Sequence, residues 1–324
     1  MTVNYSSLPI FVSHIPFQSM KKILLVLLLL VLIGLVALYL FIPGKVQINA
    51  TVSIKAAMPG VSRILLNDSN WKKWWPAETP FIYKDYTFSP EGKIFNVVQI
   101  AISKDKDSTQ TRMDLLLIEA DSMSIEWQGE AISGNDPIKR FSNYREAATI
   151  QEHMQAILTS IKSFMGKNEN IYGMHISEIK VTDSVLISTR RDFDHHPASA
   201  DIDQMIQSLK KYITANGGVE KNSPMLNVLE IAGHFETMVA IPVDRKLPET
   251  KDFTPKFLLK GGNILEAEVK GGPYAIETAV KQLENYRSDY KYGSPAIPYQ
   301  LLVTDRMKEP DTTKWVTRFY YPIY

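Results

Sequence analysis

The sequence predicts an α+β protein with one membrane-spanning helix near its N-terminus and two further α+β units behind it. Three observations predict this fold class: an uncharged apolar run, a strand-rich segment that closes with a long amphipathic helix, and an internal repeat in the second half. The chain has 324 residues, enough for about two domains of ordinary size. We expect a tail, an anchor and two domains over residues 1–22, 23–43, 45–171 and 174–324.

The composition excludes several classes of function. The 36 Lys and Arg residues balance 35 Asp and Glu residues, so the chain lacks the basic field of proteins that bind nucleic acid through phosphates. We therefore expect no nucleic-acid partner. The absence of cysteine excludes disulfides, thiolate metal sites and a cysteine nucleophile. Hydrophobic residues make up 45% of the chain, an ordinary value for a protein with a buried core.

The apolar run from Ile23 to Ile42 predicts a membrane-spanning helix. Its twenty residues carry no charge, and as a helix they extend about 30 Å, the thickness of the hydrocarbon layer. A cleaved signal peptide is the alternative, but the run ends in the bulky residues Tyr39, Leu40 and Phe41 and not in small residues typical of a cleavage site. We therefore expect an uncleaved anchor.

Basic residues around the run predict its orientation. Lys21 and Lys22 precede it directly, and Lys45 is the basic residue that follows most closely. The positive-inside rule then favours a cytoplasmic N-terminus, with a single-pass anchor in a bacterial inner membrane and soluble domains in the periplasm. Met20 lies directly before the two lysines and is an alternative start to Met1.

The segment over residues 45–171 predicts a sheet followed by a closing helix. Residues 46–54 alternate between apolar and polar side chains, as in a strand with one buried face. Pro59 opens a short helix, and further strands are expected over residues 93–103, 111–119 and 122–129. In the closing helix, apolar side chains recur every three or four residues at Ile150, Met154, Ile157, Leu158, Ile161, Phe164 and Met165.

This segment resembles the START-like superfamily, also called the polyketide cyclase or SRPBCC superfamily. The resemblance rests on the first strand with Asn49 to Ile54, on the closing helix, and on the sequence N-D-S-N-W-K-K-W-W-P from Asn67 to Pro76. It implies a helix-grip fold, in which a curved sheet around a long helix encloses an apolar cavity. Such domains bind hydrophobic small molecules or lipids, and only some of them are enzymes.

Aromatic and charged residues of this segment are candidates for the cavity. Trp71 and Trp75 are predicted ligand contacts, and packing of the tryptophans between helix and sheet is the alternative. Arg112 and Glu126 are either polar groups of the cavity or ordinary surface charges.

The segment over residues 174–324 contains an internal repeat that predicts pseudo-twofold symmetry. Residues 185–190 and 264–269 read as equivalent strands, each followed by an amphipathic helix. Each copy continues with a Ser-Pro pair, an apolar strand and a last strand with a penultimate proline, at Pro224 and Pro242 in the first copy and at Pro295 and Pro322 in the second. Two β-α-β-β units of about seventy-five residues are too long for a solenoid. We expect two antiparallel sheets that meet around a groove, with helices on the outer faces.

This segment resembles the GyrI-like, or effector-binding, family found at the C-terminus of multidrug-responsive bacterial regulators. The motifs that carry the resemblance are Leu259-Lys260-Gly261-Gly262, Gly272-Pro273-Tyr274, the strand from Pro295 to Val303, and the closing run from Thr317 to Ile323. The resemblance implies a ligand groove lined with aromatic side chains, and its candidate contacts here are Tyr274, Tyr299, Trp315 and Tyr320.

The chain departs from this family at the position of a groove glutamate. The family places that glutamate in the last strand, four residues before its proline, where this chain has Arg318 and, in the first copy, Met238. An acidic anchor for lipophilic cations is therefore missing, whereas an arginine suits an anionic or aromatic ligand. The alternative is that Arg318 pairs with Glu266 or Glu268 across the sheet, and both glutamates are also candidate groove residues. Strand alternation places Arg318 and Tyr320 on one face.

No motif predicts a metal or a cofactor. The run from Asp192 to His196 has the residue types of a metal site, but adjacent histidines do not both reach one ion without unusual backbone, and a solvated loop capped by Asp201 or Ser199 explains it. The sequence has no phosphate loop, dinucleotide-binding motif or nucleophile elbow. No helix-turn-helix precedes the second domain, so we do not expect a transcription factor.

The sequence therefore predicts a membrane-anchored protein that senses or sequesters a hydrophobic or aromatic small molecule. A hydrolase or cyclase that acts on a small hydrophobic substrate in one of the cavities is the alternative, with Glu266, Glu268 and Tyr299 as the residues to test. A few relatives of the second domain hydrolyse small reactive compounds, which supports this alternative. A third hypothesis is a scaffold that binds a membrane partner through its groove.

Overall fold

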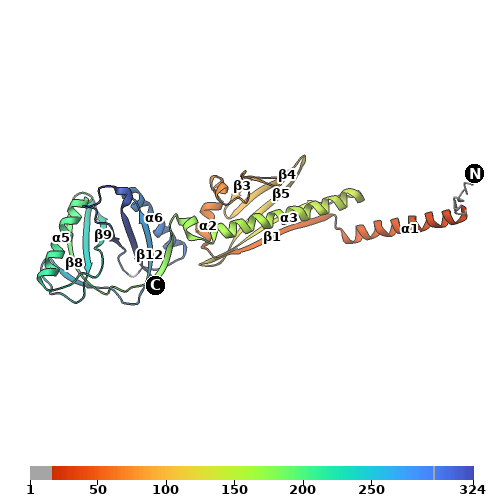
Figure 1. Cartoon of the computed structure of the whole chain (residues 1–324). Helices are drawn as coiled ribbons and strands as arrows, with labels where there is room; N and C mark the ends of the chain where they lie inside the picture. The colour runs from red at the N-terminus through yellow and green to blue at the C-terminus, as the bar shows by residue number, and fades with distance from the viewer. Residues whose placement is uncertain (1–16, 295) are drawn as a thin grey trace, which may run out of the picture.

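The computed structural model describes residues 17–294 and 296–324, which form three parts in a row (Figure 1). Helix α1, Phe17–Phe41, lies at one end. A six-stranded unit follows it, and an eight-stranded unit that includes the C-terminus lies at the other end. The chain is thus a mixed α+β protein with two curled sheets and one apolar N-terminal helix. Residues 1–16 of the expected tail and Pro295 of the expected Ser-Pro pair lie outside the described residues.

The six-stranded unit is an antiparallel sheet that curls around one long helix. In sheet order its strands are β1 Lys45–Ile54, β6 Ser122–Ile132, β5 Asp107–Glu119, β4 Val97–Lys104, β3 Tyr86–Ile94 and β2 Ile82–Tyr83. The long helix, α3 Pro137–Met165, packs on β1 and β6. Three short helices complete the unit: α2 Met58–Leu65, η1 Asp68–Lys73 and α4 Asn168–Tyr172.

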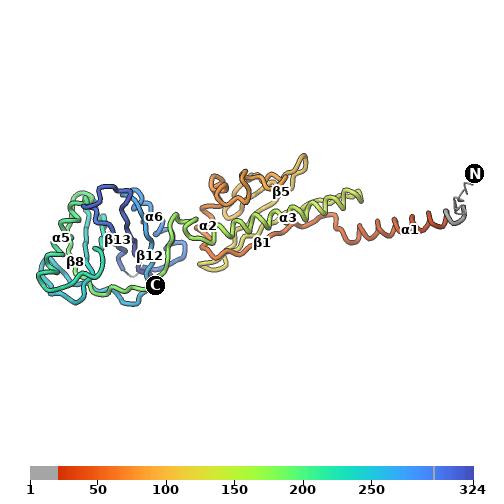
Figure 2. Tube along the Cα trace, in the orientation of Figure 1, coloured from red at the N-terminus to blue at the C-terminus, as the bar shows by residue number. Residues whose placement is uncertain are grey.

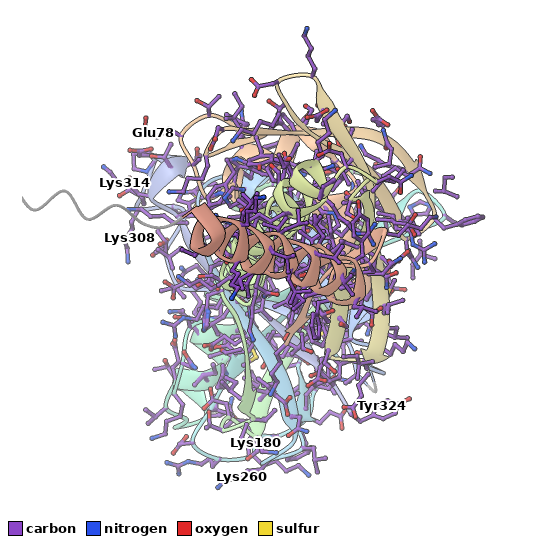
Figure 3. All side chains as sticks on the ribbon, turned by 90° about the vertical axis from the view of Figure 1, so that its right-hand side faces the viewer. Glu78, Lys180, Lys260, Lys308, Lys314 and Tyr324 are labelled. Atoms are coloured by element: carbon purple, nitrogen blue, oxygen red, sulfur yellow. The ribbon has the colours of Figure 1, made fainter. Side chains whose placement is uncertain are left out.

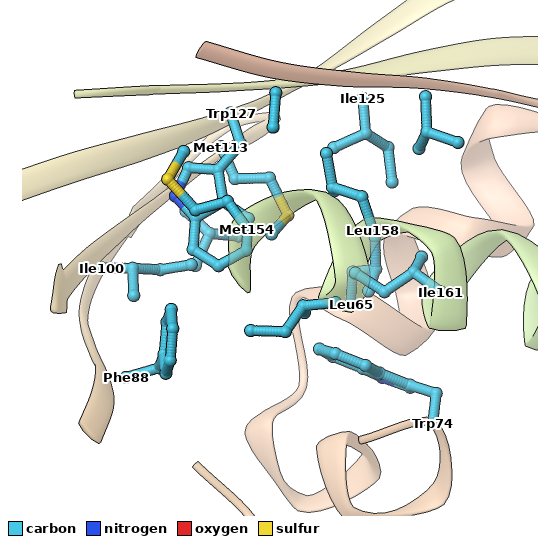
Figure 4. Close-up of a cluster of buried hydrophobic side chains, with 14 of the residues drawn as sticks. Leu65, Trp74, Phe88, Ile100, Met113, Ile125, Trp127, Met154, Leu158 and Ile161 are labelled. Atoms are coloured by element: carbon cyan, nitrogen blue, oxygen red, sulfur yellow. The ribbon is translucent and has the colours of Figure 1, made fainter. Parts of the chain in front are cut away.

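The apolar stripe of the closing helix fills the interior of this unit. Met154, Leu158 and Ile161 are fully buried and belong to one core cluster with side chains of the sheet. In Figure 4, Met154 lies beside Met113 of β5 and Trp127 of β6, and Leu158 lies beside Ile125 of β6. Burial of a large apolar side chain stabilises a fold by about 1.5–3 kcal/mol. The contact between α3 and the sheet therefore stabilises this unit.

The predicted strand over residues 93–103 is wrong at its beginning, because a hairpin turn divides it. β3 ends at Ile94 and β4 begins at Val97, and Phe95 in the turn has a φ of 54°. The rest of β3 was not predicted. It contains Pro90 and Gly92, residues typical of turns, and the register of β3 on β4 shifts between them.

The eight-stranded unit is one continuous antiparallel sheet with two helices. In sheet order its strands are β11 Thr254–Phe257, β8 Val185–Phe193, β10 His234–Pro242, β9 Met225–Ile231, β13 Tyr299–Leu302, β14 Val316–Pro322, β12 Asn263–Lys270 and β7 Ile176–Lys180. The helices are α5 Ser199–Ala215 and α6 Pro273–Asp289, and a short turn of 3-10 helix, η2 Thr312–Lys314, precedes β14.

The strand order is symmetric about its centre, as the sequence repeat predicts. The order β8-β10-β9 in one half corresponds to β12-β14-β13 in the other, and α5 and α6 follow the equivalent strands β8 and β12. The expectation of two separate sheets is wrong, because β9 and β13 pair with each other and join the halves. The outermost strands are exchanged: β7 pairs with β12 of the second half, and β11 pairs with β8 of the first.

A buried carboxylate connects the two units. Asp289 at the end of α6 is buried, and its two oxygens accept hydrogen bonds from Arg63 of α2 at 2.8 and 2.5 Å. Tyr172 of α4 donates its hydroxyl to the same carboxylate at 2.8 Å, and burial together with this bond raises the pKa of Tyr172. A Cβ on Gly60 would lie 2.6 Å from the Tyr172 hydroxyl, so this position needs a glycine.

Replacing Asp289 by asparagine should weaken the connection between the units. The Arg63 side chain is 43% exposed and regains water, so we expect a loss of about 1–2 kcal/mol in the free energy of unfolding. Urea denaturation of the full chain in detergent measures the loss. The matched control Asp305→Asn removes a surface ion pair with Lys308 and should cost less than about 0.5 kcal/mol. Equal losses in both variants would show that Asp289 has no special role.

Candidate functional site

The candidate site lies on the face of the eight-stranded sheet that carries no helix, here called the open face. Helices α5 and α6 both pack on the other face of the sheet, one on each half. Because the sheet is curled, its strands lie between the two helices in Figure 2. Because side chains alternate along a strand, the neighbours of those helix-facing residues point to the open face. There they form a separate apolar cluster of Leu186, Met225, Ala240 and Leu301, with Leu258, Tyr299 and Tyr320 packed against it.

A cavity of about 250 Å³ lies on the open face of the first half of the sheet. Its walls are almost entirely apolar. It is close in size to the smallest ordinary ligand pockets, which begin at about 300 Å³. Its lining comes from β8, β9, β10 and β11, from the segment before β13 and from the first residue of β13. The main residues are Leu186, Met225, Met238, Ala240, Lys256, Phe257, Leu258, Ile297 and Tyr299.

Tyr299 lines this cavity and begins a chain of polar contacts. Its ring stacks on that of Tyr320, with ring centroids 5.1 Å apart and planes at 23°. Tyr320 donates its hydroxyl to Oε2 of Glu266, its cross-strand partner, at 2.5 Å. Burial raises the pKa of both tyrosine hydroxyls, and for Tyr320 the bond to Glu266 adds to this effect. Both phenols therefore keep their proton at physiological pH; Tyr320 uses it in the bond to Glu266, and that of Tyr299 is available to a ligand.

Arg318 forms an ion pair across the sheet. Its Nε donates to Oε2 of Glu268, its cross-strand partner, at 2.7 Å, and this bond raises the pKa of Arg318. The structure thus shows the pairing that the sequence left open as one of two alternatives. The pair lies in the second half of the sheet, outside the lining of the cavity, and contact of Arg318 with a ligand stays a prediction.

Trp71 and Trp75 pack in the core of the six-stranded unit. The indole nitrogen of Trp71 donates to the carbonyl oxygen of Leu65 at 2.8 Å, and that of Trp75 donates to the carbonyl oxygen of Ile82 at 2.7 Å. The two rings stack with centroids 6.1 Å apart. Each indole N–H therefore has a backbone partner, as the packing alternative expects. A ligand contact by either ring stays a prediction.

The charged candidates of that unit lie on the face of the sheet away from α3. Arg112 pairs with Asp114 at 3.0 Å, and Glu126 accepts a hydrogen bond from Gln128 at 3.3 Å. The neighbouring residues in the two strands, Met113 and Trp127, point into the core. Since side chains alternate along a strand, Arg112 and Glu126 point away from the core.

Trp315 and Tyr274 lie outside the cavity. The buried Trp315 precedes β14, its indole nitrogen donates to the carbonyl oxygen of Glu309 at 2.9 Å, and the guanidinium of Arg306 lies 4.9 Å from its ring centroid. Tyr274 is the second residue of α6 and is exposed. The structure therefore brings Tyr299, Tyr320, Glu266, Glu268 and Arg318 together and leaves the other predicted aromatic residues elsewhere.

Three residues of the cavity come from a strand that sequence analysis did not predict. Lys256, Phe257 and Leu258 lie in or directly after β11. This strand contains Pro255, and a proline argues against a strand unless it lies at the edge of a sheet. β11 is such an edge strand, paired with β8. The sequence did contain a signal that Met238 faces the cavity, because the repeat makes it the counterpart of Arg318, a predicted groove residue.

Two other hollows have a different character. One of about 230 Å³ lies between the sheet and α6 and shares Asn227 and Tyr299 with the first cavity. Another, of about 320 Å³, lies between α5 and residues 302–307 and has charged walls, including the ion pair of Lys210 and Glu220 at 3.1 Å. Paired charges suit an apolar guest poorly. We take the cavity on the open face as the candidate site because its walls are almost entirely apolar and include Tyr299.

Within residues 17–294 and 296–324, no group of three or more His, Asp or Glu side chains is arranged to hold a metal ion. The run with adjacent histidines makes local contacts. His195 lies 2.7 Å from Asp194 and 3.7 Å from Asp201. Asp201 also accepts a hydrogen bond from the backbone of Ala198, as expected of a helix cap at the start of α5.

Comparison with known proteins finds distant structural similarity only. No family model matches the chain, and no curated protein matches it. The C-terminal domain of EcmrR is 12% identical, with a TM-score of 0.39, over 47% of this chain and 98% of that one. SAV2435 bound to tetraphenylphosphonium is 12% identical, with a TM-score of 0.32, over 47% and 94%. The di-domain ARO/CYC protein BexL is 9% identical, with a TM-score of 0.32, over 86% and 85%. At these values a functional conclusion must rest on the geometry of the cavity.

Stability should fall at alkaline pH as the tyrosines of the open face ionise. Folding raises the pKa of Tyr299 and Tyr320 above the unfolded value of about 10, so their contribution is full below pH 10 and is lost as the pH rises toward the folded values. Tyr320→Phe should make this fall shallower in urea denaturation over a pH series. The exposed Tyr324→Phe is the control and should keep the wild-type slope. An unchanged slope in Tyr320→Phe would contradict the assignment.

Proposed function

We propose that this protein is a membrane-anchored binder that senses or sequesters a small hydrophobic or aromatic molecule. In this proposal residues 45–171 form a START-like domain and residues 174–324 form a GyrI-like effector-binding domain. The observation that carries the proposal is the apolar cavity of about 250 Å³ on the open face, with Tyr299 in its wall stacked on Tyr320. Apolar walls with a few placed polar groups are the ordinary composition of a ligand site.

The charges near the cavity favour a neutral or anionic ligand over a cation. Lys256 lines the cavity and has no ion-pair partner among the described residues. The two nearby carboxylates are already engaged, Glu268 by Arg318 and Glu266 by the hydroxyl of Tyr320. A cation would therefore meet an uncompensated ammonium group, whereas an anionic group on the ligand would neutralise it.

The end of α1 supports an uncleaved anchor over a signal peptide. The stretch Lys21–Phe41 is long and apolar enough to cross a membrane, a property that signal sequences share. The residues after it, however, belong to the fold: Ile42 is buried, and its carbonyl oxygen accepts two hydrogen bonds from Arg140 of α3 at 2.8 and 2.5 Å. Within the helix itself, Tyr39 donates its hydroxyl to the carbonyl oxygen of Asn135, and a removable peptide would gain nothing from such a contact. We propose an inner-membrane anchor with the two sheets in the periplasm. The positive-inside rule favours this orientation because Lys21 and Lys22 precede the apolar run.

A hydrolase or cyclase is the second candidate. The observation that favours it is the hydrogen bond between Tyr320 and Glu266 beside the cavity, because a carboxylate next to a phenol is able to accept or deliver a proton. This candidate predicts turnover of a small ester that is lost in Glu266→Gln. A binding protein shows no turnover, and its affinity changes little in that variant.

Small aromatic compounds should stabilise the full chain in detergent. We suggest naphthalene, naphthalene sulfonate and tetraphenylphosphonium as neutral, anionic and cationic probes. A compound present at a hundred times its Kd adds about 2.7 kcal/mol to the free energy of unfolding. We expect naphthalene sulfonate to stabilise most and tetraphenylphosphonium least, as measured by thermal unfolding and titration calorimetry. Failure of all three probes to bind would count against the proposal.

Variants of the cavity should separate its apolar and charged contributions. Tyr299→Ala removes a stacked ring from the wall and should cost about 2 kcal/mol, or roughly thirtyfold in Kd, for every probe that binds. Lys256→Gln should weaken the sulfonate but leave naphthalene unchanged. Tyr274→Ala, which truncates an exposed ring outside the cavity, is the control. An equal loss in Tyr299→Ala and Tyr274→Ala would place the ligand elsewhere.

A further inference from the structure

The junction between α1 and the six-stranded unit is held by a dense set of polar contacts. Ser133 donates its hydroxyl to the carbonyl oxygen of Pro43 at 2.5 Å and its amide to that of Gly44 at 3.0 Å. Tyr39 donates its hydroxyl to the carbonyl oxygen of Asn135. The guanidinium of Arg140, which donates to the carbonyl oxygen of Ile42, also lies 4.7 Å from the ring centroid of Tyr39. The direction of α1 relative to this unit is therefore fixed.

This junction places the first turns of α3 beside the last turn of α1. The two helices contact each other, and Figure 1 shows the start of α3 next to the end of α1. Figure 3, viewed from the α1 end, shows this helix in front of the six-stranded unit. The end of a helix that spans a bilayer lies at the boundary between acyl chains and headgroups. In a bilayer, the start of α3 would lie at the depth of Tyr39 and Phe41.

The same region carries large apolar side chains that remain exposed. Ile138, in the first turn of α3, is 81% exposed, and Phe141 and Tyr144 follow on the same side of the helix at three-residue spacing. Ile132 at the end of β6 is 70% exposed. The amide of Asn143 donates to the carbonyl oxygen of Ile132 at 3.2 Å, so the end of this strand lies beside the helix. These four side chains are called the junction patch below.

We propose that the junction patch inserts into the interfacial layer of the lipid bilayer that α1 crosses. The inference rests on the membrane anchor proposed above and adds a second contact with the membrane. Its occupant is the bilayer, because the patch continues directly from a helix that is itself exposed and apolar along its length. Removal of apolar area from water is favourable, and tyrosine favours this layer because one end of its ring is polar.

The charges on these turns suit an anionic membrane surface. Lys139 and Arg145 are exposed, and neither has an ion-pair partner among the described residues. Asp136 is engaged as the cap of α3, where it accepts hydrogen bonds from the amides of Ile138 and Lys139 at 3.0 and 2.8 Å. A basic side chain near anionic lipid is attracted to the membrane surface. The patch therefore combines apolar insertion with attraction to phospholipid headgroups.

The proposal has a consequence for the ligand site. Two contacts, α1 and the junction patch, fix the orientation of the six-stranded unit on the membrane. Helix α3 has 29 residues and leads away from α1, toward the eight-stranded unit (Figure 1). A helix of this length extends about 43 Å. The cavity on the open face is thus held away from the bilayer, and its ligand enters from the aqueous compartment.

Single cysteines test the proposal cleanly, because the chain has none of its own. The full-length variants Ile138→Cys and Phe141→Cys are labelled with bimane and reconstituted into vesicles of phosphatidylethanolamine and phosphatidylglycerol, with and without nitroxide-labelled lipid. We expect blue-shifted emission and quenching by the lipid nitroxide as strong as for Leu40→Cys at the end of α1. Lys260→Cys, in the eight-stranded unit, should show several-fold weaker quenching and no shift. Leu30→Cys, in the middle of α1, reports on the anchor itself.

Each outcome decides between the two proposals. Quenching of Leu30→Cys without quenching of Ile138→Cys and Phe141→Cys would leave the anchor intact and overturn the inference about the patch. Absence of quenching at Leu30→Cys would overturn the anchor and the patch together. A blue shift at Ile138→Cys without lipid quenching would mean that protein covers the patch, either a second copy or a partner, and would also overturn it. All five labelled positions are exposed, so the labels do not disturb a core.

Discussion

Two residue pairs between β9 and β13, Leu226 with Gln300 and Met225 with Leu301, join the halves of the eight-stranded sheet. Without them each half would present an open edge strand, and the cavity, which takes its lining from both sides of this seam, would lose its wall. The pairing is short because β13 has only four residues. Tyr299, its first residue, lies at the seam, and this explains why two cavities share its side chain.

The cavity exists because the two copies of the repeat have diverged. Ala240 of β10 lies opposite Ser188, and the corresponding pair in the second half is Tyr320 opposite Glu266. This strand register differs by one residue from the sequence alignment of residues 185–190 with residues 264–269. Two small side chains leave space, and a phenol hydrogen-bonded to a carboxylate fills it. On its open face the duplicated fold thus has an apolar cavity in the first half and a hydrogen-bonded polar pair at the corresponding place in the second half. At each end of the six-stranded unit an arginine makes the connecting hydrogen bonds. Arg140 donates to the carbonyl oxygen of Ile42 after α1, and Arg63 donates to Asp289 of α6 in the eight-stranded unit.

Much of the fold follows from periodic patterns in the sequence. The stripe of α3, the alternation in β1 and the repeat around β8 and β12 each reflect one buried face, and burial of a face imposes its period on the sequence. Predictions failed where that link is weak. Phe95 adopts a positive φ in a hairpin turn where a glycine would be the usual signal. The proline of β11 lies in an edge strand, and the proline of β3 lies where the pairing with β4 shifts register. The lining of the candidate cavity was anticipated in part, since it includes Tyr299, whereas Lys256 and Leu258 were not anticipated.

The sequence by itself determined the apolar N-terminal helix, the α+β class, the core stripe of the long helix and the duplication, because each depends on spacing along the chain. Only the tertiary structure decided which charges are neutralised. Arg318 meets Glu268 and Arg63 meets Asp289 across separations of 50 and 226 residues. It also decided that the halves form one sheet and that the space lies beside Ala240. Such facts depend on which strands become neighbours and on the volume left between side chains, and no local pattern in a single chain encodes either.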